Sequence, residues 1–206
     1  MNGESRSALR RRLRQTRRNL SPALQHQASQ RLFRQLAQHP LFIRSQHIAF
    51  YLANDGEIDP ALLMAHARRL GKQCYLPVIT GWPMDRMHFQ KITGDQRWTK
   101  NRFGILEPII KRGLQARPWR LDLVLMPLVG FDEQGNRLGM GGGFYDRTFA
   151  YRRCRQTWKG ASLLGLAHDC QKVEALPVAS WDIPLDGIVS DREMLLFREG
   201  FRGRCE

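Results

Sequence analysis

Residues 121–147 read LDLVLMPLVGFDEQGNRLGMGGGFYDR, and this stretch indicates the class of fold. It begins with Leu121 to Leu128, a nearly unbroken apolar run of the kind found in a strand that is buried on both faces. A glycine-rich loop follows, and a helix is predicted over residues 144–155. A buried strand joined to a helix in this way is typical of an α/β protein.

Strands and helices are predicted to alternate on both sides of this stretch. Strands are expected at 47–52, 73–78, 87–92, 161–167 and 187–190, and a helix at 60–70. Residues 93–120 are rich in Gly, Pro and charge, and we expect irregular connections there. The pattern predicts a mainly parallel sheet flanked by helices. A length of 206 residues suits a single domain over 1–206.

Two helices are predicted before the first strand, within residues 1–38. Over residues 6–20, leucines recur near one face of a helix. A second stripe consists of Arg6, Arg10, Arg14 and Arg17. Ser21-Pro22 fits an N-cap followed by proline at the first helical position, so a second helix is expected from there to about Gln38. We expect both helices to pack on the α/β core.

The charge of the chain favours anionic partners. The formal net charge is +14, from 33 Lys and Arg against 19 Asp and Glu. Nucleic acid is one candidate, and an anionic small molecule such as ATP or a polycarboxylate is another. No segment approaches the roughly 18 apolar residues of a membrane span. The four cysteines show no CxxC spacing, which favours a reduced protein of the cytoplasm.

The segment from Gly130 to Arg147 carries the clearest chemical signal. Its glycines at 135, 139, 141, 142 and 143 leave backbone N–H groups free to approach phosphate oxygens, although the same composition also suits a merely flexible loop. The segment lacks the Gly-Lys-Ser/Thr of a Walker A motif, and Phe144 interrupts a GxGxxG pattern. The aromatic and charged residues at 144–147 favour the phosphate-binding interpretation.

The run RLGMGGGFYDR resembles the signature of the 5-formyltetrahydrofolate cyclo-ligase family. Further segments resemble that family in the same order along the chain. These are the basic first helix ending in Asn19-Leu20-Ser21, the run Tyr51 to Asp59 (YLANDGEID), Tyr75-Leu76-Pro77, Gly104 to Pro108 (GILEP) and Trp181 to Asp186 (WDIPLD). The resemblance covers nearly the whole chain. It implies a fold similar to that of sugar-phosphate isomerases and CoA transferases, with an N-terminal helical segment.

The resemblance also implies a reaction. ATP and Mg²⁺ would activate the formyl oxygen of 5-formyltetrahydrofolate by phosphorylation, and N10 of the folate would then attack the formyl carbon. The products would be 5,10-methenyltetrahydrofolate, ADP and phosphate. Such chemistry depends on positioning and charge neutralisation, which backbone N–H groups, arginines and a metal ion supply.

The resemblance assigns roles to individual residues. It implies nucleotide contacts by Arg6, Arg10, Arg137, Leu138, Gly139, Met140, Gly141, Gly142, Gly143, Phe144 and Tyr145. It implies folate contacts by Leu52, Glu57, Met140, Gly141, Gly142, Gly143 and Phe144. It implies catalytic roles for Arg147 and Tyr145, and metal ligands in Asp146 and Asp182. Some relatives carry lysine where this chain has Gly142, so a cation would have to come from Arg137, Arg147 or the first helix.

Other residues are expected to be structural. Arg14 and Arg17 are interpreted as solvated, and Asp186 and His168 as structural residues. A nucleic-acid-binding protein on the same scaffold is the main alternative, although the tryptophans show no regular interleaving with basic residues. A kinase or hydrolase of another anionic metabolite is a third hypothesis. No membrane partner is expected.

Overall fold

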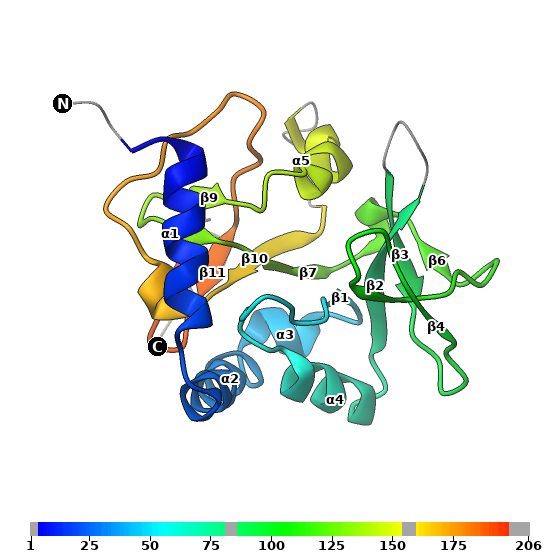
Figure 1. Cartoon of the computed structure of the whole chain (residues 1–206). Coiled ribbons are helices and arrows are strands. Elements are labelled where there is room, and N and C mark those ends of the chain that lie inside the picture. The colour runs from blue at the N-terminus through cyan, green and yellow to red at the C-terminus, as the bar shows by residue number, and fades with distance from the viewer. Residues whose placement is uncertain (1–3, 81–85, 154–159, 198–206) are drawn as a thin grey trace.

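A mixed eight-stranded sheet runs through the molecule, with five parallel strands at its centre (Figure 1). The computed structural model describes residues 4–80, 86–153 and 160–197. The strands of this sheet are β1 (His47–Ala49), β2 (Gln73–Thr80), β3 (Arg86–Lys91), β6 (Gln115–Ala116), β7 (Leu123–Pro127), β10 (Ser162–Leu166), β11 (Gly187–Val189) and β12 (Met194–Leu196). Their order is β12-β11-β10-β7-β1-β2-β3-β6, and the last strands at either side run antiparallel. The prediction of a mainly parallel α/β sheet is confirmed.

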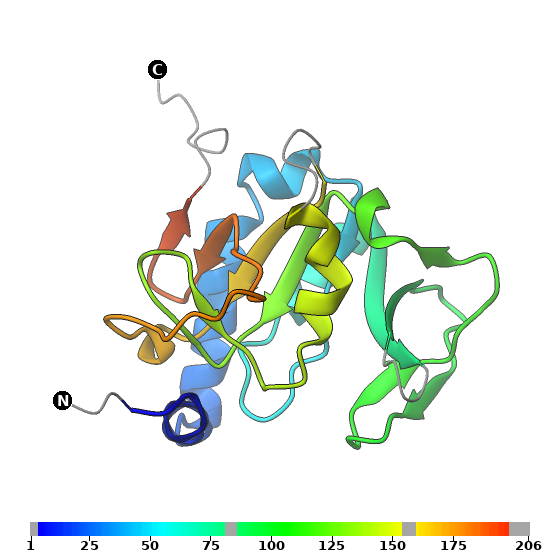
Figure 2. The same cartoon turned by 90° about the horizontal axis from the view of Figure 1, so that it is seen from above.

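Helices cover both faces of the sheet. One face carries α2 (Pro22–Leu36), α3 (Pro40–Arg44) and α4 (Ala61–Arg69), and the other carries α5 (Phe144–Phe149), which continues as a 3-10 turn, η2 (Ala150–Arg153). Figure 1 shows the sheet between these layers, and Figure 2 shows α5 lying over it from above. The Ser21 side chain accepts from the Leu24 N–H and Pro22 opens α2, as predicted.

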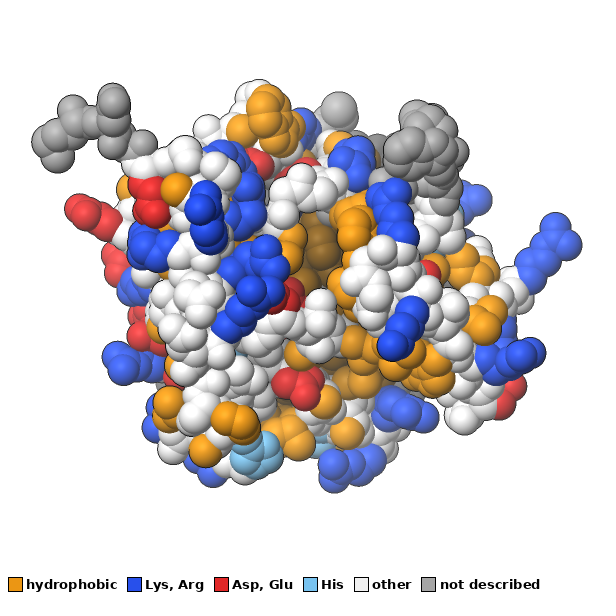
Figure 3. Space-filling view, in the orientation of Figure 1, with side chains coloured by type: hydrophobic (Ala, Val, Ile, Leu, Met, Phe, Trp, Pro, Cys, Tyr) orange, Lys and Arg blue, Asp and Glu red, His pale blue; other side chains and the backbone are white. Residues whose placement is uncertain are grey.

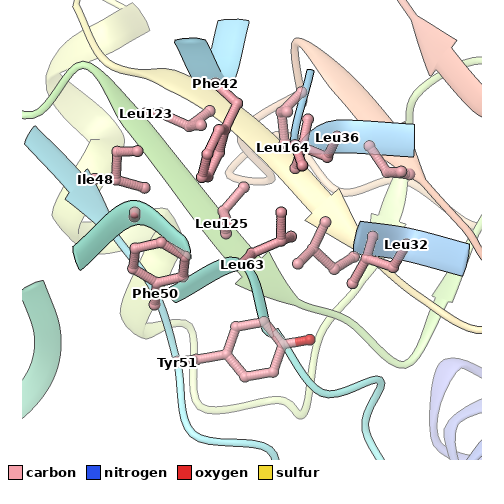
Figure 4. Close-up of a cluster of buried hydrophobic side chains, with 14 of the residues drawn as sticks. Leu32, Leu36, Phe42, Ile48, Phe50, Tyr51, Leu63, Leu123, Leu125 and Leu164 are labelled. Carbon is pink, nitrogen blue, oxygen red and sulfur yellow. The ribbon is translucent and has the colours of Figure 1, made fainter. Parts of the chain in front are cut away.

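The central strand β7 supplies side chains to both layers, because successive residues of a strand point to opposite faces. Leu123 and Leu125 pack with Phe42 and the other side chains shown in Figure 4. Val124 and Met126 instead join the cluster beneath α5. All four side chains are almost inaccessible to solvent, which explains why the sequence of this strand is apolar without alternation.

The first helix, α1 (Arg6–Arg18), lies beside the sheet rather than on either of its faces (Figures 1 and 2). Leu9 and Leu13 pack against Val129, Leu138 and Leu176. These partners belong to or adjoin the hairpin formed by β8 (Gly130–Phe131) and β9 (Arg137–Leu138). The packing turns one arginine stripe of α1 toward the carboxyl ends of the parallel strands.

Several elements differ from the sequence prediction. Residues 93–120 are not simply irregular, because they contain β6, the hairpin of β4 (Trp98–Lys100) and β5 (Leu106–Pro108), and the turn η1 (Pro118–Arg120). A short helix that the sequence did not predict, α3, begins at Pro40. The helix expected over 144–155 is α5 followed by η2, and residues 154–155 lie outside the described part of the chain. No helix among the described residues is both long enough and apolar enough to cross a bilayer.

Candidate active site

A cavity of about 810 Å³ lies near the carboxyl ends of β1, β2 and β7, where open α/β sheets usually bind their ligands. The segments that line it include the arginine stripe of α1, the turn at residues 54–57, the glycine loop at 139–143 and residues 101–107. Figure 3 shows this hollow, with apolar side chains inside it and basic side chains along one rim. The sheet thus brings together segments that are far apart in the sequence.

The glycine loop presents unpaired backbone donors. Gly141 and Gly143 have φ angles of 99° and 62°, which residues with a Cβ atom rarely adopt. The N–H groups of residues 140–143 donate to no acceptor within the described residues. Arg10 donates from Nε to the Gly139 carbonyl oxygen at 2.7 Å, which holds a cation beside the loop. Free N–H groups next to a guanidinium form a suitable site for phosphate oxygens.

Three arginines of α1, Arg14, Arg17 and Arg18, are paired with the same carboxylate, that of Asp55. Arg14 and Arg18 both form ion pairs with the Asp55 carboxylate, whose turn closes one end of the cavity. Arg17 is completely buried and donates to the Asp55 carboxylate, the Asp55 carbonyl oxygen and the Leu128 carbonyl oxygen. The interpretation of Arg14 and Arg17 as solvated is therefore wrong. Arg11 and Arg12, on the other side of the helix, remain exposed.

The turn at 54–57 carries two carboxylates with opposite pKa shifts. Burial alone would raise the pKa of Asp55, but hydrogen bonds from Arg14, Arg18 and Arg17 hold that pKa at about 2. Burial raises the pKa of Glu57 to about 7, against the lowering influence of Arg17 and of the Asn54 N–H. Glu57 therefore changes its charge near neutral pH while facing the cavity. Such a group is a candidate functional residue.

Aromatic side chains surround Glu57 and the glycine loop. Tyr145 is partly buried, and desolvation together with the nearby Glu57 raises the pKa of its phenol, which therefore stays protonated. Phe144 meets Phe103 edge-to-face, with ring centroids 6.1 Å apart. Leu52 lines the cavity and packs against the core below it.

Asp146 and Asp182 line the same cavity, and each is paired with an arginine. Oδ1 of Asp146 accepts from Arg137 Nη2 at 2.5 Å and from the Ile183 N–H at 3.1 Å. Asp182 accepts from Arg6 through both of its oxygens, at 2.8 and 3.3 Å. No group of three or more metal-binding side chains occurs in residues 4–80, 86–153 and 160–197.

The structure gathers most of the predicted site residues around this cavity. Those that line it are Arg6, Arg10, Leu52, Glu57, Arg137, Gly139, Met140, Gly141, Gly142, Gly143, Phe144, Tyr145, Asp146 and Asp182. Leu138 is instead buried beneath α1. The Arg147 guanidinium stacks on the Phe144 ring at 5.1 Å and is not among the lining side chains. His168 and Asp186 are both buried, as expected of structural residues.

One wall of the cavity was not predicted to carry function. It consists of Ile79, Met87, Asn101, Phe103, Ile105, Leu106 and Glu107. The GILEP segment at 104–108 contributes to the family resemblance, but the sequence assigns it no contact with a ligand. A buried glutamate inside an apolar segment is the one local signal that would have drawn attention to Glu107.

Comparisons with known proteins agree with this geometry. The chain is 39% identical over 180 residues to the 5-formyltetrahydrofolate cyclo-ligase of Escherichia coli strain K12, covering 86% of this chain and 96% of that protein. It is 38% identical over 195 residues to the Haemophilus influenzae protein of the same name, covering 92% and 99%. The structure of Aquifex aeolicus 5,10-methenyltetrahydrofolate synthetase superposes with a TM-score of 0.79 at 30% identity, covering 95% of this chain and 94% of that one. The sequence model of the 5-formyltetrahydrofolate cyclo-ligase family matches residues 2–191, and this chain belongs to that family.

Proposed function

We propose that this protein closes 5-formyltetrahydrofolate to 5,10-methenyltetrahydrofolate at the expense of ATP, releasing ADP and phosphate. The observation that carries the proposal is that one cavity is lined both by a glycine loop with the Arg10 guanidinium beside it and by the largely buried carboxyl group of Glu57. The first suits a triphosphate, and the second suits the N–H donors of a pterin ring. We also propose that residues 1–206 form one domain and that the enzyme acts in the cytoplasm.

The nucleotide phosphates are assigned to the glycine loop. The free N–H groups of residues 140–143 meet the phosphate oxygens, and Arg10 is already fixed beside Gly139. Arg6 reaches the same end of the cavity and can exchange its Asp182 partner for a phosphate. Arg137 is largely buried and stays paired with Asp146. These arginines supply the positive charge that some relatives provide with a lysine at the position of Gly142.

The folate is assigned to Glu57, Leu52 and the loop from Met140 to Phe144. An ionised Glu57 accepts hydrogen bonds from the amino and ring N–H groups of the pterin. The reaction transfers the γ-phosphoryl group to the formyl oxygen, N10 then bonds to the formyl carbon, and the C–O bond breaks to release phosphate and the N10 proton. Tyr145 keeps its phenolic proton and can donate it in a hydrogen bond to the activated oxygen. Arg147 contributes through Phe144 and Gly143, on which its guanidinium lies.

The chain offers Mg²⁺ one well-suited oxygen. Oδ2 of Asp146 receives no hydrogen bond from the described residues and lies on a residue that lines the cavity. Mg²⁺ commonly binds one or two carboxylates together with phosphate oxygens and water. Asp146 and Asp182 would hold it, Asp182 once Arg6 has turned to the phosphates. Bound there, Mg²⁺ would neutralise phosphate charge beside two carboxylates that would otherwise repel it.

Asp146→Asn is expected to weaken Mg²⁺-dependent ATP binding by about tenfold, because a neutral amide is a poorer ligand for a hard cation. Asp182→Asn should act in the same direction. Calorimetric titration of ATP with and without Mg²⁺ measures the effect without requiring turnover. Metal-free folate binding should be unchanged, and Asp95→Asn, at an exposed carboxylate outside the cavity, should behave like the wild type. An unaltered Mg²⁺ dependence in both cavity variants would exclude this site.

The proposed function is tested directly by turnover. With Mg-ATP and 5-formyltetrahydrofolate, we expect the near-ultraviolet absorbance of methenyltetrahydrofolate to appear with one ADP per product. Neither substrate alone should support ADP release. Product formation without nucleotide would refute the proposed reaction.

Glu57→Gln should weaken folate binding by about 1–3 kcal/mol at pH 8, because a charged hydrogen bond is replaced by a neutral one. At pH 5.5, below the pKa of about 7, wild-type Glu57 is largely protonated and the difference should shrink. ATP affinity should not change. Folate titrations at the two pH values measure this, with Glu174→Gln, at an exposed position, as the control. Equal folate affinity of Glu57→Gln and wild type at pH 8 would place Glu57 outside the folate site.

The same substitution has a consequence for stability. Since the folded-state pKa of Glu57 is raised above its ordinary 4.5, the stability linked to its neutral form is fully present below pH 4.5 and is lost as pH rises through 7. The glutamine variant cannot ionise and escapes this loss. We therefore expect its melting temperature, relative to wild type, to increase between pH 4.5 and pH 8.

A further inference from the structure

A second buried carboxylate faces the cavity from the wall opposite α1. Glu107 lies in β5, and the structure places the β4–β5 hairpin across the cavity from α1 and the turn that α1 holds (Figures 1 and 2). Only 9% of the residue is exposed. Nearly all of Glu107 is therefore enclosed by protein, although the residue lines the cavity.

One oxygen of this carboxylate is fully engaged. Oε2 accepts from Asn101 Nδ2 at 3.2 Å and from the Ile79 backbone N–H at 3.4 Å. Asn101 is held in turn, because its Oδ1 accepts from the N–H groups of Phe103 and Ile105. The carboxylate thus has a fixed orientation.

The other oxygen lacks a partner. No hydrogen bond or ion pair to Oε1 occurs among residues 4–80, 86–153 and 160–197. Its surroundings on this wall are apolar: Ile79, Met87, Phe103, Ile105 and Leu106 line the same side of the cavity. An oriented carboxylate oxygen that opens into an apolar recess is available to accept a hydrogen bond from a ligand. An apolar slot with one oriented acceptor is the usual form of a site for a flat heterocycle.

We propose that Glu107 binds a ligand through Oε1, accepting from an amino or ring N–H group of a flat heterocycle held between this wall and Phe144. The assignment rests on the proposed function, which offers two heterocycles with such donors: the adenine of ATP and the pterin of the folate. Phe103 reaches the Phe144 ring at 6.1 Å and closes one side of the slot. Glu107 and Glu57 then divide the recognition of ring donors between opposite walls.

Glu107→Gln tests the proposal because it reverses the hydrogen-bond character of the outward atom. The glutamine carbonyl is needed toward Asn101 and the Ile79 N–H, so its NH₂ group would face the cavity. Dissociation constants for ATP, ITP and 5-formyltetrahydrofolate are measured by calorimetry in the wild type, in Glu107→Gln and in the exposed control Glu174→Gln. ITP carries a carbonyl group where ATP carries the amino group. Binding is read without turnover, so a failure of the proposed reaction is seen separately in the ADP assay.

If Glu107 binds adenine, the preference of the variant for ATP over ITP should be lower than that of the wild type by roughly tenfold or more, and its folate affinity should be unchanged. If it reads the pterin, folate affinity should fall by a similar factor while the ATP/ITP ratio stays at the wild-type value. A purely structural role would change neither the ATP/ITP preference nor the folate affinity, since the inward hydrogen bonds are retained. Wild-type values for all three ligands in a folded variant would overturn the proposal.

A second measurement uses the wild type alone, in case the variant does not fold. Purine riboside triphosphate lacks the 6-amino group of ATP, and a 2-desamino folate lacks the 2-amino group of the pterin. At least one of these analogues should bind roughly tenfold or more weakly than its parent, and the loss should persist when Glu57 is replaced by glutamine. Equal binding of both analogues and their parents would overturn the proposal.

Discussion

Gly141→Val should lower kcat/KM by roughly 100- to 1,000-fold, the loss associated with removing oriented backbone donors from an anionic transition state. Gly141 has a φ of 99°, and a β-branched residue cannot hold that angle without strain. The loop must therefore shift, which moves the N–H groups of residues 140–143 away from the phosphate positions proposed above. A Cβ atom at this position would also stand 3.7 Å from the Arg10 guanidinium carbon.

Thermal stability should change far less than activity. Gly141 is exposed, so the strained loop can relax without disturbing the hydrophobic core. Gly113→Val provides a matched control, because Gly113 has a similar φ of 83°, open space around its Cβ position and no place in the cavity. We expect that variant to have the same backbone strain as Gly141→Val and the same kcat/KM as the wild type. Full activity in folded Gly141→Val would mean that the loop does not bind the phosphates.

The central strands were predictable because their local pattern coincides with their tertiary environment. The apolar run at 121–128 becomes β7, with both faces covered, and the neighbouring parallel strands are found close to their predicted places. The β4–β5 hairpin was missed for the opposite reason. All three residues of β4 are exposed, so no alternation of apolar and polar residues marks it. Its pairing depends on contacts that a local pattern does not contain.

The candidate site was largely predictable, because the resemblance carried residue identities that elementary patterns do not provide. Two features escaped it. The unpaired oxygen of Glu107 becomes visible only when β5 and β2 are placed side by side. The burial of Arg17 was hidden because nothing in α1 distinguishes this arginine from its neighbours, and its partners Asp55 and Leu128 lie 38 and 111 positions away.

Arg17→Met is expected to lower the free energy of unfolding by about 3–5 kcal/mol, the usual cost of breaking a buried charged network. Arg17 is 0% exposed and donates through Nε, Nη1 and Nη2 to the Asp55 carbonyl, the Leu128 carbonyl and the Asp55 carboxylate, at 2.8, 3.0 and 2.9 Å. Methionine fills a similar volume but leaves both carbonyl oxygens with a lost donor. For a chain of this length, the melting temperature should fall by about 10 °C.

Arg11→Met is the matched control, since Arg11 lies on the exposed side of the same helix. Its stability should stay within about 0.5 kcal/mol of the wild type. Denaturant unfolding of the two variants gives the comparison. If Arg17→Met is as stable as Arg11→Met, the buried arginine does not stabilise the fold.

Arg17→Lys separates the charge from the shape of the guanidinium. A lysine retains the positive charge near Asp55 and Glu57. Its single ammonium group cannot replace the guanidinium, which donates to three acceptors that lie in different directions. We therefore expect most of the stability loss of Arg17→Met to remain. The pKa of Glu57 should depend on the charge instead, because the Arg17 charge lowers it against the effect of burial. The pH midpoint of folate binding should then rise in Arg17→Met and stay near the wild-type value in Arg17→Lys. An identical midpoint in both variants would mean that Arg17 does not tune Glu57.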